Sequence, residues 1–240
     1  MKRNREIKAA ARQALNGHWG WAILVCIVYG AISGVLAAPS LISSLTSSAV
    51  SGAGMGMFDP AVLVTALFTS MALSFVSGLL NLFGAGPLSV GYQNAFNKYY
   101  SDSDYNTIGN LFRLGFGGGR YWKNVWGMFL MGLFTVLWTL LFIVPGIIKA
   151  FAYALTPYIL VDNPELGPNE ARLKSIELMR GYKGKLFGLW LSFIGWFLLC
   201  ILSLGIGFIW LTPYIRTSFA AFYRDRIESE KAQIAEQVTE

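Results

Sequence analysis

The residues that could do chemistry in this sequence are few and far apart. The single histidine, His18, stands beside Trp19 and has no second metal-ligating side chain at a suitable spacing. The two cysteines, Cys26 and Cys200, each lie in an apolar run, which is typical of unpaired buried thiols rather than of a disulfide or a zinc site. We therefore predict no catalytic residue, no metal and no cofactor, and we expect a protein that is not an enzyme.

A glycine-rich stretch, GFGGGR at residues 115–120, invites comparison with phosphate-binding loops. It lacks the Lys-Ser/Thr ending of such a loop, and we expect no strand before it. We favour a flexible interfacial linker over residues 98–123.

Three charges lie close to long apolar runs, which makes them functional candidates. Asp162 and Arg216 lie near the ends of two such runs and could pair across a helical bundle, although we favour snorkelling to lipid headgroups. Lys149 lies close to a predicted turn at Pro145-Gly146. Its long stem would let the ammonium reach the polar interface from there.

Composition indicates what surrounds these residues. Only 13% of the 240 residues are charged and 55% are apolar, with a mean hydropathy of +0.50, whereas roughly 25% are charged in soluble domains. So few charges could not cover a water-exposed surface. The net charge of +6 comes from Lys and Arg beside apolar runs, which indicates lipid headgroups rather than nucleic acid as the partner.

Six apolar runs are long enough to cross the hydrocarbon core of a bilayer. They are residues 19–38, 61–83, 125–144, 146–161, 186–202 and 206–223. A secretory signal peptide is the alternative for the first run, but its apolar region would be too long. We interpret the Ser-, Gly- and Ala-rich residues 39–60 as a flexible extracytoplasmic loop. Gly and Pro at residues 84–87 should break or kink the second helix, which could continue toward Tyr100.

Positive charge orients this layout. Of the nineteen Lys and Arg residues, eighteen fall on the side that would carry both chain ends, and the exception is Lys149. The positive-inside rule therefore predicts N- and C-termini in the cytoplasm.

Two amphipathic segments precede apolar runs. In residues 169–180 the apolar positions share one helical face and the charges share the other. Residues 7–20 repeat this spacing at a constant offset of 164, so that Gly17 matches Gly181, which stands where a helix would end with positive φ. We predict two helices on the membrane surface and an internal repeat. The alternative is that two unrelated basic amphipathic helices look alike.

Three prolines, Pro87, Pro157 and Pro213, lie in the returning helices of the predicted hairpins, and LTPY occurs twice, at residues 155–158 and 211–214. A proline in a spanning helix frees a carbonyl, which can mark a functional site but more often marks a structural kink. The predicted fold is all-α: a multi-pass transmembrane helical bundle, with six spans arranged as three proline-kinked hairpins and with amphipathic interfacial helices.

We predict a single integral-membrane domain over residues 1–240. Its parts are an interfacial helix (1–18), a first hairpin (19–100), a second hairpin (101–161), an interfacial helix with a third hairpin (162–223) and a cytoplasmic tail (224–240), which we expect to be a charged, fraying helix. The structural or interfacial candidates are Gly17, Gly181, Pro87, Pro157, Pro213, Arg216, Asp162 and Lys149.

Several segments resemble a known family. SIELMRGYKGKLFGLWLSFIGWFLL, GIGFIWLTPYIRTSFAAFY and the N-terminal IKAAARQAL resemble the bacterial integral-membrane family catalogued as domain of unknown function 975. The resemblance covers most of the chain and is weakest over residues 39–60. It implies a multi-pass helical domain in a bacterial plasma membrane, and it implies no activity, substrate or catalytic residue.

Functions from different classes fit these observations. We favour a non-enzymatic membrane module that binds membrane lipids and, as further candidates, other membrane proteins. The alternative is a transporter or channel for a small, uncharged solute, which the repeats and prolines favour and the lack of a polar stripe opposes. A lipid-modifying enzyme would need a catalytic acid that the predicted spans lack. A continuous polar cavity reaching Asn81, Thr156 or Arg216 would favour transport, and a dry centre would favour a structural or partner role.

Overall fold

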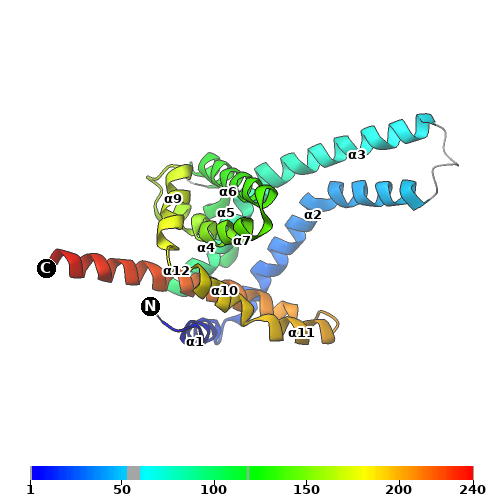
Figure 1. Cartoon of the computed structure of the whole chain (residues 1–240). Helices are drawn as coiled ribbons and strands as arrows, with labels where there is room; N and C mark the ends of the chain where they lie inside the picture. The colour runs from blue at the N-terminus through cyan, green and yellow to red at the C-terminus, as the bar shows by residue number, and fades with distance from the viewer. Residues whose placement is uncertain (1, 53–59, 118, 240) are drawn as a thin grey trace.

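The computed structural model describes residues 2–52, 60–117 and 119–239, and every regular element in these ranges is helical, as predicted (Figure 1). The first half of the chain contains α1 (Asn4–Leu15), α2 (Trp19–Gly52), α3 (Pro60–Leu80), the π-helical segment η1 (Asn81–Ala85), α4 (Gly86–Asp102) and α5 (Thr107–Phe116). The second half contains α6 (Tyr121–Leu141), α7 (Ile143–Tyr153), α8 (Thr156–Asp162), α9 (Pro168–Leu178), α10 (Lys183–Leu191), α11 (Ile194–Leu202) and α12 (Phe208–Thr239).

Among the described residues, five segments are long and apolar enough to cross a membrane by length and composition. They are Trp19–Leu45, Val64–Asp102, Tyr121–Leu141, Ile143–Asp162 and Lys183–Leu202. The sixth predicted span, residues 206–223, leads into α12 and is not among them. The first eighteen residues of α12 hold Arg216, Arg224 and Asp225, which lowers their apolar character.

A compact region, which we call the base, consists of α1, α4, α5, α8, α9 and residues 214–226 of α12. The helix α4 lies at its centre and packs against α5, α8 and α12. Its side chains are buried on several faces, including Tyr92, Phe96 and Tyr99, each at most 2% exposed. Burial of this kind removes apolar surface from any solvent, so the base has a core of its own.

A second region, which we call the arms, consists of α3, residues 132–148 of the α6–α7 hairpin, and α11. Its large apolar side chains point outward: Leu140 is 84% exposed and Leu202 is 82% exposed. In Figure 1, α3 and the outer half of α2 extend together away from the other helices, and both chain ends lie on the opposite side of the view.

The expected loop at residues 39–60 is wrong over residues 39–52, because α2 continues through Pro39 to Gly52. Residues 53–59 lie outside the described part of the chain. The serines of this stretch satisfy their hydroxyls within the helix: Ser44 and Ser48 each donate a hydrogen bond to the carbonyl four residues earlier. Ser43 reaches across to α3, where its hydroxyl donates to the Ser70 carbonyl at 3.2 Å.

The second predicted span runs on beyond its glycines, as expected, but through a different hydrogen-bond pattern. Residues 81–85 form the π-helical segment η1, and α4 then continues to Asp102 with Pro87 in its first turn. Proline fits there because the first turn of a helix does not use its missing N–H.

The predicted turn at Pro145-Gly146 is wrong. The chain reverses at Phe142 instead, and Pro145 lies in the first turn of α7. A Cβ on Gly146 would lie 2.6 Å from the Thr139 Cα, so the two helices approach too closely for any residue but glycine. The glycine therefore serves helix packing and not the turn.

The predicted linker at residues 98–123 is wrong in part, because residues 107–116 form α5. Its first turn is capped by Asn106, whose Oδ1 accepts a hydrogen bond of 3.2 Å from the Gly109 N–H. A Cβ on Gly91 of α4 would lie 1.9 Å from the Leu111 carbonyl oxygen of α5. The two backbones are therefore in direct contact.

The predicted prolines act differently from one another. Helix α7 ends at Tyr153 and α8 begins at Thr156, so Pro157 lies at a helix break as predicted. Helix α12 continues without a break through Pro213, so the predicted interruption there is wrong. The fifth predicted span has a break that the sequence analysis missed, between α10 and α11.

The two amphipathic segments share a layout. Gly17 and Gly181 have φ angles of +83° and +80° just after α1 and α9, respectively. Leu15 and its match Met179 are both fully buried. The inner faces of both helices pack against protein, α1 against α12 and α9 against α6 and α8, and their position at a membrane surface stays a prediction.

Candidate functional site

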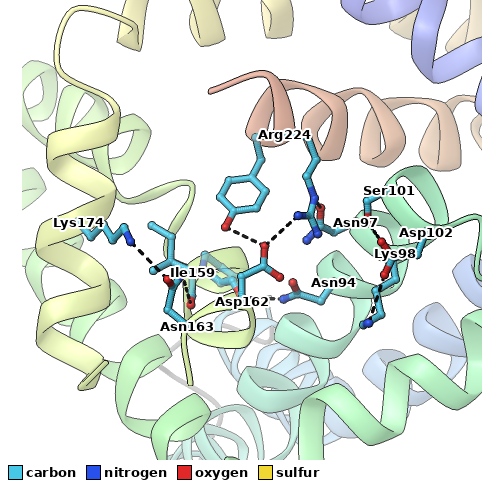
Figure 2. A network of polar contacts seen from close by, with 12 residues as sticks. Asn94, Asn97, Lys98, Ser101, Asp102, Ile159, Asp162, Asn163, Lys174 and Arg224 are labelled. Carbon is cyan, nitrogen blue, oxygen red and sulfur yellow. Dashed lines mark hydrogen bonds and ion pairs between the residues drawn. The ribbon is translucent and has the colours of Figure 1, made fainter. Parts of the chain in front are cut away.

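A chain of polar contacts joins α8, α12 and α4 within the base (Figure 2). The Asp162 carboxylate forms an ion pair with Arg224, with 3.4 Å between Oδ2 and Nη1. It also accepts a hydrogen bond of 3.0 Å from the Tyr223 hydroxyl. Arg224 in turn donates from Nε to Asn97 Oδ1 at 2.7 Å. The contacts connect residues that are up to 127 positions apart in the chain.

The ends of α8 explain why these groups meet there. Asp162 is the last residue of α8, where the helix dipole disfavours a negative charge, and the Arg224 guanidinium offsets this effect. At the other end, the Pro157 carbonyl accepts a hydrogen bond of 2.7 Å from Asn94 Nδ2. Since residues 156–161 are all buried, α4 and α12 hold both ends of an enclosed helix.

Arg216 lies elsewhere, so it does not form the pair with Asp162 that the sequence suggested. Its guanidinium carbon is 5.0 Å from the centroid of the Tyr92 ring, a cation–π contact. Tyr29 stacks on Tyr92 with 3.9 Å between centroids, and Cys26 Sγ lies 3.2 Å from the Tyr92 hydroxyl. These four side chains line a crevice of about 360 Å³ between α2 and α12.

A larger crevice of about 460 Å³ lies among α1, α2, α11 and α12. Its lining includes the indole rings of Trp19, Trp196 and Trp210, and one cation, Arg12. The Arg12 guanidinium carbon is also 5.5 Å from the centroid of the Tyr214 ring. This crevice combines a large apolar wall with a single positive charge.

The polar network and the two crevices can form non-covalent contacts. Over residues 2–52, 60–117 and 119–239, no three His, Cys, Asp or Glu side chains come together as a metal site. Cys26 and Cys200 are free thiols, as predicted. His18 stacks on Tyr105 with 3.8 Å between ring centroids, which is a packing role.

Comparison with known proteins identifies the second half of the chain. Residues 119–231 match the family model described as "Protein of unknown function (DUF975)". Residues 119–231 are similar to this family, and we call this matched stretch the DUF975 domain. The predicted resemblance is thus confirmed over these residues, and the N-terminal segment IKAAARQAL lies outside the matched range. Comparisons with curated proteins and with solved structures found no match.

The DUF975 domain takes in α6 to α11 and most of α12, and so supplies only part of each site. Asp162, Tyr223 and Arg224 of the polar network lie inside the matched residues, whereas their α4 partner Asn97 lies before them. Both crevices likewise combine α12 with residues of α2. Each of these sites therefore needs residues from the first half of the chain as well as from the DUF975 domain.

Lys149 of the DUF975 domain lies deeper in its hairpin than expected. Because the chain reverses at Phe142, Lys149 is about two helical turns from the reversal. Its ammonium lies 4.7 Å from the centroid of the Trp138 ring on α6, which gives the charge an aromatic partner within the hairpin.

Two buried arginines that the sequence did not indicate connect the base to neighbouring segments. Arg226 is 4% exposed, donates from Nε to the Leu178 carbonyl at 3.0 Å, and lies 3.8 Å from the Tyr182 ring centroid. Arg172 is 8% exposed and lies 4.0 Å from the Phe134 ring centroid. Their partners are 38 to 48 residues away, so no local pattern indicated these contacts. The start of the predicted tail is therefore anchored, and the rest is helical as expected.

Proposed function

We propose that this chain is a multi-pass protein of a bacterial plasma membrane that works as a non-enzymatic binding module. The observation that carries the proposal is the exposed apolar surface of the arms. Val64, Leu67, Phe68, Met71 and Phe75 on α3 are each more than half exposed. Continuous apolar surface of this kind marks contact with lipid or with partner helices.

The proposed orientation places six spans across the bilayer and both termini in the cytoplasm. Eighteen of nineteen Lys and Arg residues lie in the segments that we predict to face the cytoplasm. The nineteenth, Lys149, has the Trp138 ring as its neighbour. The sixth span is the first part of α12, where Arg216 has an aromatic neighbour in the Tyr92 ring. Such a distribution is what the positive-inside rule expects of cytoplasmic segments.

Binding, rather than catalysis, is the role that the base favours. Three of its charged groups make structural contacts: Asp162 pairs with Arg224 and accepts from Tyr223, and Arg226 donates to a main-chain carbonyl. Groups that are committed to structural contacts in this way hold the helices in register. We propose that the base fixes the geometry of the arms, whose outer surfaces take lipids and partner proteins.

The three residues that a transport pathway was expected to reach, Asn81, Thr156 and Arg216, give the transport alternative less support. Thr156 is fully buried in the base, and the Asn81 amide donates to the Ser77 carbonyl of its own helix at 2.8 Å. Arg216 lines the crevice between α2 and α12. The three positions thus have different surroundings, which favours the binding module over a transporter.

Fractionation tests the membrane proposal directly. The full chain, expressed in bacteria, should stay in the membrane pellet after washing with sodium carbonate at high pH and should enter solution only with detergent. Recovery in the aqueous fraction would reject it. Reconstituted vesicles separate the two functions, because swelling in uncharged solutes at a rate above that of empty vesicles would favour the transporter.

A further inference from the structure

The larger crevice is an apolar groove that follows the seam between α11 and α12. Its lining extends from Gly207, just before α12, to Tyr214 on that helix, a rise of about 10 Å. On the outer side, Leu199 is 58% exposed and Trp210 is 52% exposed, so the groove opens away from the protein. Its depth and lining suit a flexible hydrocarbon chain.

Positive charge lies at one end of this groove. Arg12 lines the groove, and Lys8 lies one turn earlier on the same face of α1. Neither has a carboxylate within 4.0 Å among the described residues. Lys8 Nζ instead donates to the carbonyl and hydroxyl of Ser192, each at 3.3 Å. Burial, together with repulsion from the nearby Arg12 guanidinium, lowers the pKa of Lys8.

The shape and the charge together specify the occupant. A partner helix would cover the apolar wall but would not need two cations at one end. A neutral lipid would fill the wall and leave the cations unpaired. An anionic phospholipid satisfies both, because its phosphate meets the guanidinium and ammonium while an acyl chain fills the groove.

We propose that the groove between α11 and α12 binds one anionic phospholipid, with its phosphate at Arg12 and Lys8. The inference rests on the proposed membrane function and makes it specific, since it names one lipid class and one place. The indole rings of Trp19, Trp196 and Trp210, which line the groove, would contact the acyl chain.

The test is the thermal stability of the full-length protein in dodecyl maltoside micelles, titrated with dioleoyl phosphatidylglycerol. A ligand that binds the folded state raises the Tm in a saturable way. We expect saturation with phosphatidylglycerol and at least a tenfold higher midpoint concentration with dioleoyl phosphatidylcholine. Equal effects of the two lipids would overturn the proposal. So would an equal Tm rise with glycerol 3-phosphate, because that would indicate an anion site without an acyl chain.

Two matched pairs of variants locate the site. Arg12→Gln should raise the phosphatidylglycerol midpoint about tenfold, whereas Arg5→Gln, which removes the same charge from an exposed position on α1, should leave it unchanged. Trp210→Ala should weaken the response, whereas Trp122→Ala, at a 68% exposed position outside the groove, should not. Unchanged midpoints for Arg12→Gln and Trp210→Ala would overturn the proposal. A protein that stays in membranes but lacks the lipid preference would refute this inference and leave the proposed function standing.

Discussion

The base and the arms solve the same problem, the burial of apolar side chains, in opposite ways. In the base, short helices enclose one another, so that Ile7, Leu15 and Phe96 are each at most 1% exposed. In the arms, the helices leave their side chains outside, so that Leu140 and Leu202 are more than four-fifths exposed. The base thus contains its own solvent-free core, whereas the arms need an apolar environment supplied from outside.

The glycines sharpen this difference. In the base, a Cβ on Gly91 would lie 1.9 Å from the Leu111 carbonyl oxygen, and a Cβ on Gly115 would lie 2.7 Å from the Pro87 carbonyl oxygen. In the arms, a Cβ on Gly78 or Gly132 would meet no atom within 4 Å. Glycine is therefore a packing requirement at Gly91 and Gly115 of the base and at Gly146 between α6 and α7, and it is replaceable at Gly78 and Gly132 of the arms.

The largest expected effect comes from Gly91→Ala. The new methyl group cannot fit without separating α4 from α5, so we expect a loss of about 3–5 kcal/mol of folding free energy, the range of severe core changes. The measurement is the Tm in detergent and the yield of folded protein. Gly132→Ala is the matched control, and because alanine favours helix over glycine by about 1 kcal/mol, its Tm should stay the same or rise. Equal losses in the two variants would erase the distinction between base and arms.

A smaller effect is expected from Asp162→Asn. The change leaves the Arg224 guanidinium without its carboxylate in a half-buried position, which should cost about 1–3 kcal/mol. The comparison is Asp102→Asn, whose ion pair with Lys98 is more exposed and should contribute only about 0.3–0.5 kcal/mol. If Asp102→Asn lowered the Tm as much as Asp162→Asn, the network of Figure 2 would have no special weight.

The smallest expected effect depends on pH. Hydrogen bonds from the Asn110 amide and from the Asn106 N–H lower the pKa of Asp104 below its usual value near 3.8. A lowered pKa in the folded state means that the ionised carboxylate stabilises α5 above the unfolded-state pKa, and that this is lost as pH falls through the folded-state pKa. Since Asp104 is largely solvated, the contribution should be at most about 0.5 kcal/mol.

The measurement for this residue is the Tm of wild type and Asp104→Asn between pH 7 and pH 3. The difference should be constant from pH 7 to about pH 5 and should shrink below that. A difference that grows on acidification would show that the hydrogen bonds of Asp104 do not favour its ionised form.

Local pattern predicted the parts of the fold that depend on local physics. The spacing of apolar residues gave the faces of α1 and α9, and the offset of 164 found two glycines that share a positive φ. Pro157 marked a helix break, and it lies in the first turn of α8, where its missing N–H is not needed. The loop predicted from composition was wrong over residues 39–52. Serine is common in loops of soluble proteins, but in α2 the serine hydroxyls donate hydrogen bonds to carbonyls of their own helix.

The base could not be predicted because its contacts join distant segments. Arg224 looked like the start of a charged tail, yet its partners are Asp162 and Asn97 on two other helices. The close approach of α4 and α5 depends on Gly91, which by itself resembles any glycine of a spanning helix. A signal for α5 was nevertheless present, since Asn106 precedes Leu111 and Leu114 at the spacing of a capped amphipathic helix.

Cysteine labelling across the membrane tests the central claim most directly. In a background with Cys26 and Cys200 replaced by alanine, single cysteines are introduced by Leu204→Cys, in the 94% exposed turn between α11 and α12, and by Gln233→Cys in the exposed end of α12. A membrane-impermeant maleimide applied to intact spheroplasts should label the first site and reach the second only after lysis. Labelling of the Gln233→Cys site in intact spheroplasts, with the turn protected, would contradict the proposed arrangement of base and arms.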